Sequence, residues 1–138
     1  MPLWIGYALL AAVFAALVAI FGKVGVREVD ATLATAVRAV IMAAFLVTAA
    51  VALGKTGSLG SISRRSFLFI VLSGAAGAAS WLFYFIALRE GPATGVAALD
   101  RLSVVIVFIL AVLFLGDAFT AKAALGAALV VAGAILLT

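Results

Sequence analysis

The chain has 138 residues and a net charge of +4, and 69% of its residues are hydrophobic while 10% are charged. Soluble domains carry about 25% charged residues, so we interpret this chain as an integral membrane protein and its scattered Lys and Arg as topology signals, with no nucleic-acid partner. The sequence contains neither Cys nor His, which excludes disulfides and thiolate chemistry and removes the commonest metal ligand and near-neutral general base.

Two apolar segments open the chain, at about residues 3–21 and 31–53. Each is close to the roughly 20 apolar residues that a spanning helix needs. Gly22 and Gly25 loosen the end of the first segment, and Asp30 is placed to cap the start of the second. The first segment has no basic stretch before it and no soluble domain after it, so we expect a membrane helix and not a signal peptide.

Three further apolar segments follow, at about residues 67–88, 93–115 and 121–138. Pro92, with the glycine before it, marks a turn ahead of the second of these, and Thr120 is placed to cap the last. The predicted fold class is therefore all-α, a polytopic membrane protein with five transmembrane helices.

A single domain over residues 1–138 with five spans has its two ends on opposite sides of the membrane. The loops on the N-terminal side hold four basic residues, namely Lys55, Arg64, Arg65 and Lys122. The loops on the opposite side hold three, namely Lys23, Arg27 and Arg89. Under the positive-inside rule this narrow bias weakly favours a cytoplasmic N-terminal side, or a chain that inserts both ways, and we expect the cell inner (plasma) membrane.

Charged residues interrupt the apolar pattern at two places. Arg38 lies about seven residues into the second segment, and Asp100 and Arg101 lie as far into the fourth, so all three sit roughly 10 Å from the side opposite the N-terminus. A lone charge at the centre of a membrane helix costs about 2.5–3.5 kcal/mol, which favours pairing. We predict an ion pair between Arg38 and Asp100, either as a structural link between two helices or as part of a polar site in a water-filled cavity.

Aromatic residues in the third segment match that depth. Trp81 and Tyr84 follow Ser80 in the last turns before the opposite side. They fit an interfacial aromatic belt, and they equally fit the aromatic wall of a site for an organic cation or amphipathic ligand.

Small residues mark close helix packing in two of the segments. Ser73–Gly77 and Gly74–Ala78 each have the small-xxx-small spacing that lets helices approach in lipid, and Gly126 and Gly133 share one face of the last segment. These positions predict either packing within one subunit or a contact between subunits.

Several stretches along the whole chain resemble one transporter family. They are Thr32–Arg38 (TLATAVR), Ser80–Gly91 (SWLFYFIALREG), Leu99–Ser103 (LDRLS), Leu113–Thr120 (LFLGDAFT) and Gly126–Gly133 (GAALVVAG). In this order and spacing they are similar to the half-length form of the EamA-like branch of the drug/metabolite transporter superfamily. The chain departs from the family pattern at Ala98, where Pro is frequent, at Arg101, where Lys is usual, and at Asp117, where Glu is usual.

The resemblance implies one repeat of a ten-helix transporter whose two five-helix repeats have inverted orientations. Such repeats hold the substrate near the midplane and move against each other for alternating access. A half-length chain would then work as an antiparallel homodimer, or as a heterodimer with a related chain. The related small multidrug resistance proteins use a Glu in their first helix, whereas Asp100 is the one carboxylate well inside the membrane here.

The leading functional prediction is a secondary transporter subunit for small organic metabolites or similar solutes in the bilayer. The alternatives are a flippase subunit for lipid or lipid-linked sugar, and a structural membrane subunit that does not transport. We find no nucleophile–base pair, metal cluster or phosphate loop in the sequence, so we expect no enzyme, cofactor or metal site.

Overall fold

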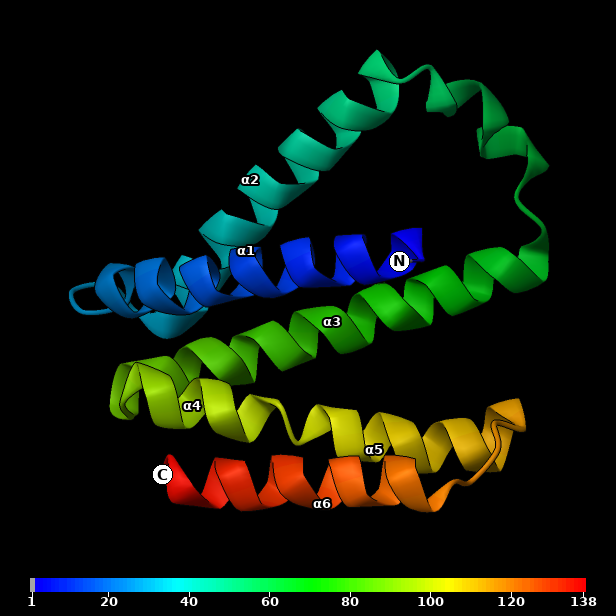
Figure 1. Cartoon of the computed structure of the whole chain (residues 1–138). Coiled ribbons are helices and arrows are strands. Elements are labelled where there is room, and N and C mark those ends of the chain that lie inside the picture. Colours follow the sequence, from blue (N-terminus) through cyan, green and yellow to red (C-terminus); the bar gives the residue numbers. More distant parts are fainter. Residues whose placement is uncertain (1) are drawn as a thin grey trace. The chain divides into compact units, whose positions relative to one another are not determined.

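The computed structural model describes residues 2–138, which form an all-α chain (Figure 1). Its elements in order are α1 (Leu3–Gly25), α2 (Ala31–Ala52), the 3-10 helix η1 (Lys55–Ser61), α3 (Arg64–Glu90), α4 (Ala93–Asp100), α5 (Ser103–Leu110), the π-helical turn η2 (Ala111–Leu115) and α6 (Ala121–Leu136). Four stretches are long and apolar enough to cross a membrane: α1, α2, α3 and the run from α4 through η2. The all-α polytopic prediction is confirmed at this level, with α6 as a shorter apolar helix of 16 residues.

The chain forms two compact units. We call residues Gly25–Arg89, with α2, η1 and α3, the hairpin unit. We call Met1–Val24 together with Glu90–Thr138, with α1 and α4 to α6, the terminal unit. Each unit is described by itself below.

Large apolar side chains point outward over most of the helical surface. Phe14 is 64% exposed, Phe45 is 73% exposed and Phe83 is 70% exposed. The buried hydrophobic residues among those described are few and mostly small, namely Ala19, Val26, Ala31, Phe85, Leu88, Ala98 and Ala134. In water such a surface would aggregate, so the lipid bilayer is the solvent that this fold requires.

Side-chain caps fix where the helices of the hairpin unit begin. Asp30 caps α2 as predicted, because its Oδ1 accepts hydrogen bonds from the backbone N–H groups of Thr32 (2.9 Å) and Leu33 (3.1 Å). α3 starts at Arg64 and not near residue 67 as predicted, since the backbone N–H of Ser66 donates to Ser63 Oγ (3.1 Å) and caps the helix earlier. α3 also continues to Glu90, past the predicted end at residue 88.

The predicted end of the first helix was also too early. α1 continues through Gly22 to Gly25, although the sequence predicted an end near residue 21. A glycine inside a helix costs only about 1 kcal/mol, which is less than the cost of leaving backbone groups unbonded at the edge of the bilayer.

The fourth predicted segment forms one candidate span, Ala93–Leu115, in which the regular helical hydrogen bonding changes at one point. α4 ends at Asp100 and α5 begins at Ser103, and the backbone bonds between them join residues three apart: Arg101 N–H to Ala98 O (3.1 Å), Leu102 N–H to Leu99 O (2.9 Å) and Val104 N–H to Arg101 O (3.0 Å). The run then ends in the π-helical turn η2, where Gly116 takes a left-handed φ of 74° that favours glycine.

Within the terminal unit, α6 lies along α4 and α5 (Figure 1). Thr120 caps α6 as predicted, because its Oγ1 accepts the backbone N–H of Ala123 at 3.2 Å. Gly95 lies where α4 approaches the end of α6: a Cβ there would lie 3.5 Å from Leu137 O, which is an ordinary van der Waals contact. The helix ends at Leu136, two residues short of the predicted end at residue 138.

Candidate functional site

The membrane-embedded Arg38 lies on an aromatic ring of the neighbouring helix in its unit. Its guanidinium carbon Cζ is 3.7 Å from the centroid of the Trp81 ring and 5.5 Å from that of Phe85. A cation over the face of Trp within about 6 Å is attracted by the negative face of the ring, and this attraction grows when water is excluded. The contact joins the first half of α2 to the second half of α3.

Three aromatic rings form one cluster on α3 around this contact. The ring centroids of Trp81 and Tyr84 are 5.4 Å apart at 76°, and those of Trp81 and Phe85 are 6.1 Å apart at 67°, both edge-to-face arrangements that aromatic pairs favour. Phe85 is buried (4% exposed), as is Leu88 one turn further on. Trp81 and Tyr84 were predicted from the sequence, but Phe85 was not. Phe85 could have been predicted because it follows Trp81 by four residues and so lies on the same helical face.

No carboxylate of the hairpin unit lies near Arg38 along the chain. The sequence has no Asp or Glu between Asp30 and Glu90. Within its unit, the Arg38 guanidinium is held by aromatic faces and makes neither a hydrogen bond nor an ion pair with another described residue. Its N–H groups therefore remain available as donors in a half-buried position.

The second charged place lies where the helix of the terminal unit is interrupted. Asp100 is the last residue of α4, and its Oδ2 is 3.5 Å from Nη2 of its neighbour Arg101, with side chains 36% and 52% exposed. The regular i to i−4 backbone ladder is replaced here by tighter bonds. An interrupted helix inside a membrane is tolerated where its backbone is buried in protein or lines a water-filled cavity.

The predicted site residues thus fall into two groups. Arg38, Trp81 and Tyr84 come together in the hairpin unit, and Asp100 and Arg101 come together in the terminal unit. The ion pair between Arg38 and Asp100 would join the two units, and it stays a prediction.

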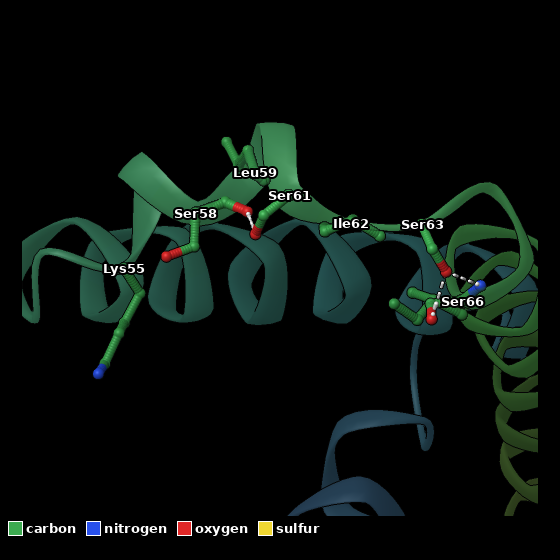
Figure 2. Close-up of a pocket in the computed structure, with 8 residues that line it drawn as sticks. Lys55, Ser58, Leu59, Ser61, Ile62, Ser63 and Ser66 are labelled. Atoms are coloured by element: carbon green, nitrogen blue, oxygen red, sulfur yellow. Dashed lines mark hydrogen bonds between the residues drawn. The ribbon is translucent and has the colours of Figure 1, made fainter.

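The end of the hairpin unit at η1 carries a polar hollow of about 450 Å³, shown in Figure 2. Lys55 and the hydroxyls of four serines line it together with apolar side chains. The serines serve the loop itself: Ser61 Oγ donates to Ser58 O (2.7 Å), and Ser63 Oγ donates to Ser66 Oγ (2.9 Å). These bonds lie within η1 and at the start of α3, so we assign the serines a role in holding the loop.

Charged groups at the other end of the hairpin unit hold the helix ends together. Arg89 Nη1 lies 3.4 Å from Asp30 Oδ2, which links the end of α3 to the start of α2. The backbone N–H of Leu33 and then that of Thr32 lower the pKa of the Asp30 carboxyl below its ordinary value of 3.8, and the charge of Arg89 adds to this. In the terminal unit, Lys23 Nζ donates to Gly91 O at 2.8 Å.

The glycines predicted for helix packing have space beside them. A Cβ added at Gly74, Gly77, Gly126 or Gly133 would meet no neighbouring atom within 4 Å. Their role in a contact between subunits stays a prediction. Among the described residues, the structure has no group of three acidic side chains that could hold a metal ion.

Comparison with known proteins gives a family for this arrangement. Residues 2–138 match the EamA-like transporter family. A protein of Sinorhizobium sp, described as an uncharacterized transporter in the cobO 3′ region, is 46% identical over 134 residues, which cover 97% of this chain and 95% of that protein. No solved structure matches the chain.

Proposed function

Since this chain belongs to the EamA-like transporter family, an integral membrane family of transporters and not of enzymes, we propose that it is a secondary transporter subunit for small organic solutes that works as an antiparallel dimer. The observation that carries the proposal is the charged pair Asp100 and Arg101 at the point where the regular hydrogen bonding of a membrane-spanning stretch changes. Transporters commonly build substrate and ion sites from discontinuous helices near the membrane midplane, where unwound backbone and half-helix ends face a cavity.

The charged residues support the same proposal. Arg38, Asp100 and Arg101 each have a cost of insertion into the bilayer, and charged residues inside a membrane commonly mark a functional site. Asp100 supplies the one carboxylate deep in a span, so it is the group through which we propose that a coupling proton or cation acts. Arg38, Trp81 and Tyr84 are the proposed substrate contacts.

The proposed dimer follows from the number of helices and the charge of the loops. A chain that crosses the membrane an odd number of times can pair with a second copy in the opposite orientation. This pairing gives the inverted-repeat arrangement from a single sequence. The near-even distribution of basic loop residues permits both insertions. The open faces at Gly126 and Gly133 on α6 are the proposed contact between the two copies.

Reconstitution of the purified chain tests the proposal. Proteoliposomes are offered radiolabelled small organic anions, cations and zwitterions, and entry is compared with that into protein-free liposomes. We expect entry of at least one charge class, loss of this entry in Asp100→Asn, and normal entry in Asp117→Asn, which makes the same change at an exposed position outside the spans. Entry of no labelled solute, or full activity of Asp100→Asn, would contradict the proposal.

A further inference from the structure

The contact between Arg38 and Trp81 bears on the charge of the ligand. An aromatic wall attracts an organic cation through the negative face of its ring. Here the face of Trp81 already holds the guanidinium of Arg38, with 3.7 Å between Cζ and the ring centroid. A cationic ligand would have to displace Arg38 and approach against its charge, at a depth where water screens little.

The same contact leaves the hydrogen-bonding edge of Arg38 free. The N–H groups of a guanidinium lie in its plane and point outward, so a guanidinium that lies over a ring can still donate to a ligand beside it. Two parallel N–H groups match the geometry of a carboxylate, sulfonate or phosphate. Trp81 therefore orients this edge without using its donors.

The charge of the hairpin unit acts in the same direction. Gly25–Arg89 contains six basic and two acidic residues, so this unit has the whole net charge of +4, while the terminal unit has three of each sign. Both acidic residues of the hairpin unit, Glu28 and Asp30, precede α2. The potential around Arg38 from its own unit is thus positive, which favours a negative ligand.

From these observations we infer that Arg38, seated on Trp81, is an oxyanion-binding subsite of the transport site. It binds the carboxylate, sulfonate or phosphate end of a small organic anion, and the half-buried rings of Trp81 and Tyr84 contact the apolar body of that anion. The inference rests on the proposed transport function in so far as the bound anion is the transported solute.

Asp100 is the carboxylate that the sequence predicts as a partner of Arg38. It has a partner in Arg101, so it does not depend on Arg38 for neutralisation. The ion pair predicted between Arg38 and Asp100 and a bound anion exclude each other at any one moment. Removal of the charge in Asp100→Asn should therefore strengthen anion binding if the two compete.

Trp81 provides a direct test, because the sequence contains only two tryptophans and Trp4→Phe leaves Trp81 as the sole reporter. The full chain with Trp4→Phe is placed in nanodiscs of phosphatidylcholine and titrated with benzenesulfonate or with phenyltrimethylammonium, which have similar aromatic bodies and opposite fixed charges. We expect benzenesulfonate to change Trp81 fluorescence saturably, and phenyltrimethylammonium to give no saturable change.

Variants connect this signal to Arg38. In Arg38→Gln we expect benzenesulfonate to bind about tenfold more weakly or worse, since a charged hydrogen bond is lost. Arg65→Gln, the matched change in the first turn of α3, should leave binding unchanged. Arg38→Lys keeps the positive charge but not the planar guanidinium. Its affinity for benzenesulfonate should lie between those of wild type and Arg38→Gln. This variant keeps the inference testable if Arg38→Gln does not fold. Equal binding of the cation, or unchanged binding of benzenesulfonate in both Arg38 variants, would overturn the inference.

Two further experiments identify the source of the anion and distinguish failure of the anion site from failure of the transport function. If phosphatidylglycerol in the nanodisc competes with benzenesulfonate, the anion at Arg38 is a lipid headgroup; without competition it is a soluble solute. If benzenesulfonate binds through Arg38 and proteoliposomes move no solute, the anion site stands and the transport function fails. If proteoliposomes move phenyltrimethylammonium and not benzenesulfonate, the transport function stands and the anion site fails.

Discussion

The two charged places in the membrane differ in how their charges are stabilised. Arg38 lies on an unbroken helix and is stabilised by rings of a neighbouring helix, with Trp81 as the nearest. Asp100 lies where its own helix is interrupted, and its nearest opposite charge is the next residue, Arg101. The first solution keeps the backbone regular and leaves side-chain donors free. The second keeps the charge locally paired and disturbs the backbone.

The difference suggests a division of tasks. A rigid, ring-supported guanidinium suits recognition, because its geometry changes little when a ligand arrives. An interrupted helix suits movement, because few residues need to change their backbone conformation when one half of the helix shifts against the other. Four sets of variants test this division of tasks.

Removal of the ring that supports Arg38 should have the largest effect on stability. Trp81→Ala is expected to lower the free energy of unfolding by about 3–5 kcal/mol, because it deletes a large packed side chain and leaves the charge uncovered. Unfolding in mixed micelles by added sodium dodecyl sulfate measures this. Trp4→Ala is the matched control: Trp4 is 69% exposed, and its loss should change the free energy by less than about 0.5 kcal/mol. Equal losses in both variants would remove the special role of Trp81.

Charge reversal addresses the predicted link between the two places. Asp100→Arg alone should cost about 3 kcal/mol, since it adds a third positive charge at the depth of Arg38 and Arg101. The double variant Arg38→Asp with Asp100→Arg should recover folded yield in the membrane if the two residues pair. Size-exclusion profiles of the single and double variants after extraction measure this yield. A double variant that is no better folded than either single reversal would exclude the pair.

Proline substitution compares the interrupted helix with the regular one. Ser103 is the first residue of α5, but Leu102 before it is helical (αR), which a following proline disfavours, so we expect Ser103→Pro to cost less than a proline inside α2 and not to be neutral. Val40→Pro, inside α2, should cost about 3 kcal/mol or more, because it removes a backbone hydrogen bond and clashes with the preceding turn. Both are measured by the same unfolding titration. Similar costs at the two positions would show that the backbone at Asp100 is as regular as that of α2.

The smallest effect concerns the cap of α2. Hydrogen bonds from Leu33 and Thr32 hold the pKa of Asp30 below its ordinary value of 3.8, so the carboxylate stabilises the fold fully above that value and loses this contribution as pH falls through the lowered pKa. Wild type should therefore lose helix stability on acidification below about pH 4. Asp30→Asn keeps a capping oxygen and should lack this component of the pH dependence, which circular dichroism against pH would show. Identical profiles would contradict it.

The parts of the fold that the sequence predicted well depend on local interactions. Asp30 and Thr120 each cap the helix that follows, and their role could be seen from the residue type and the next apolar run. Ser63 has the same kind of role but stands among other polar residues of the loop, so the start of α3 was placed too late. The interruption after Asp100 was missed because no Gly or Pro marks Leu99–Ser103.

The candidate site was predictable in its depth but not in its contacts. Counting residues from the helix starts placed Arg38 and Trp81 at similar depths, and the structure brings these two together. From the sequence we predicted Asp100 as the partner of Arg38, because opposite charges attract, and this ion pair stays a prediction. The contact of Arg38 with a ring face depends on how α2 and α3 approach each other, which spacing along one helix does not reveal.

The orientation of the chain tests the central claim of an antiparallel dimer most directly. The sequence has no Cys, so Thr138→Cys provides a single reactive thiol at the end of α6. A membrane-impermeant maleimide is added to intact cells, and a second, distinguishable maleimide is added after permeabilisation. The account predicts that about half of the chains react in intact cells, because both insertions occur in one population. Reaction of nearly all chains in only one of the two steps would contradict an antiparallel dimer of this chain.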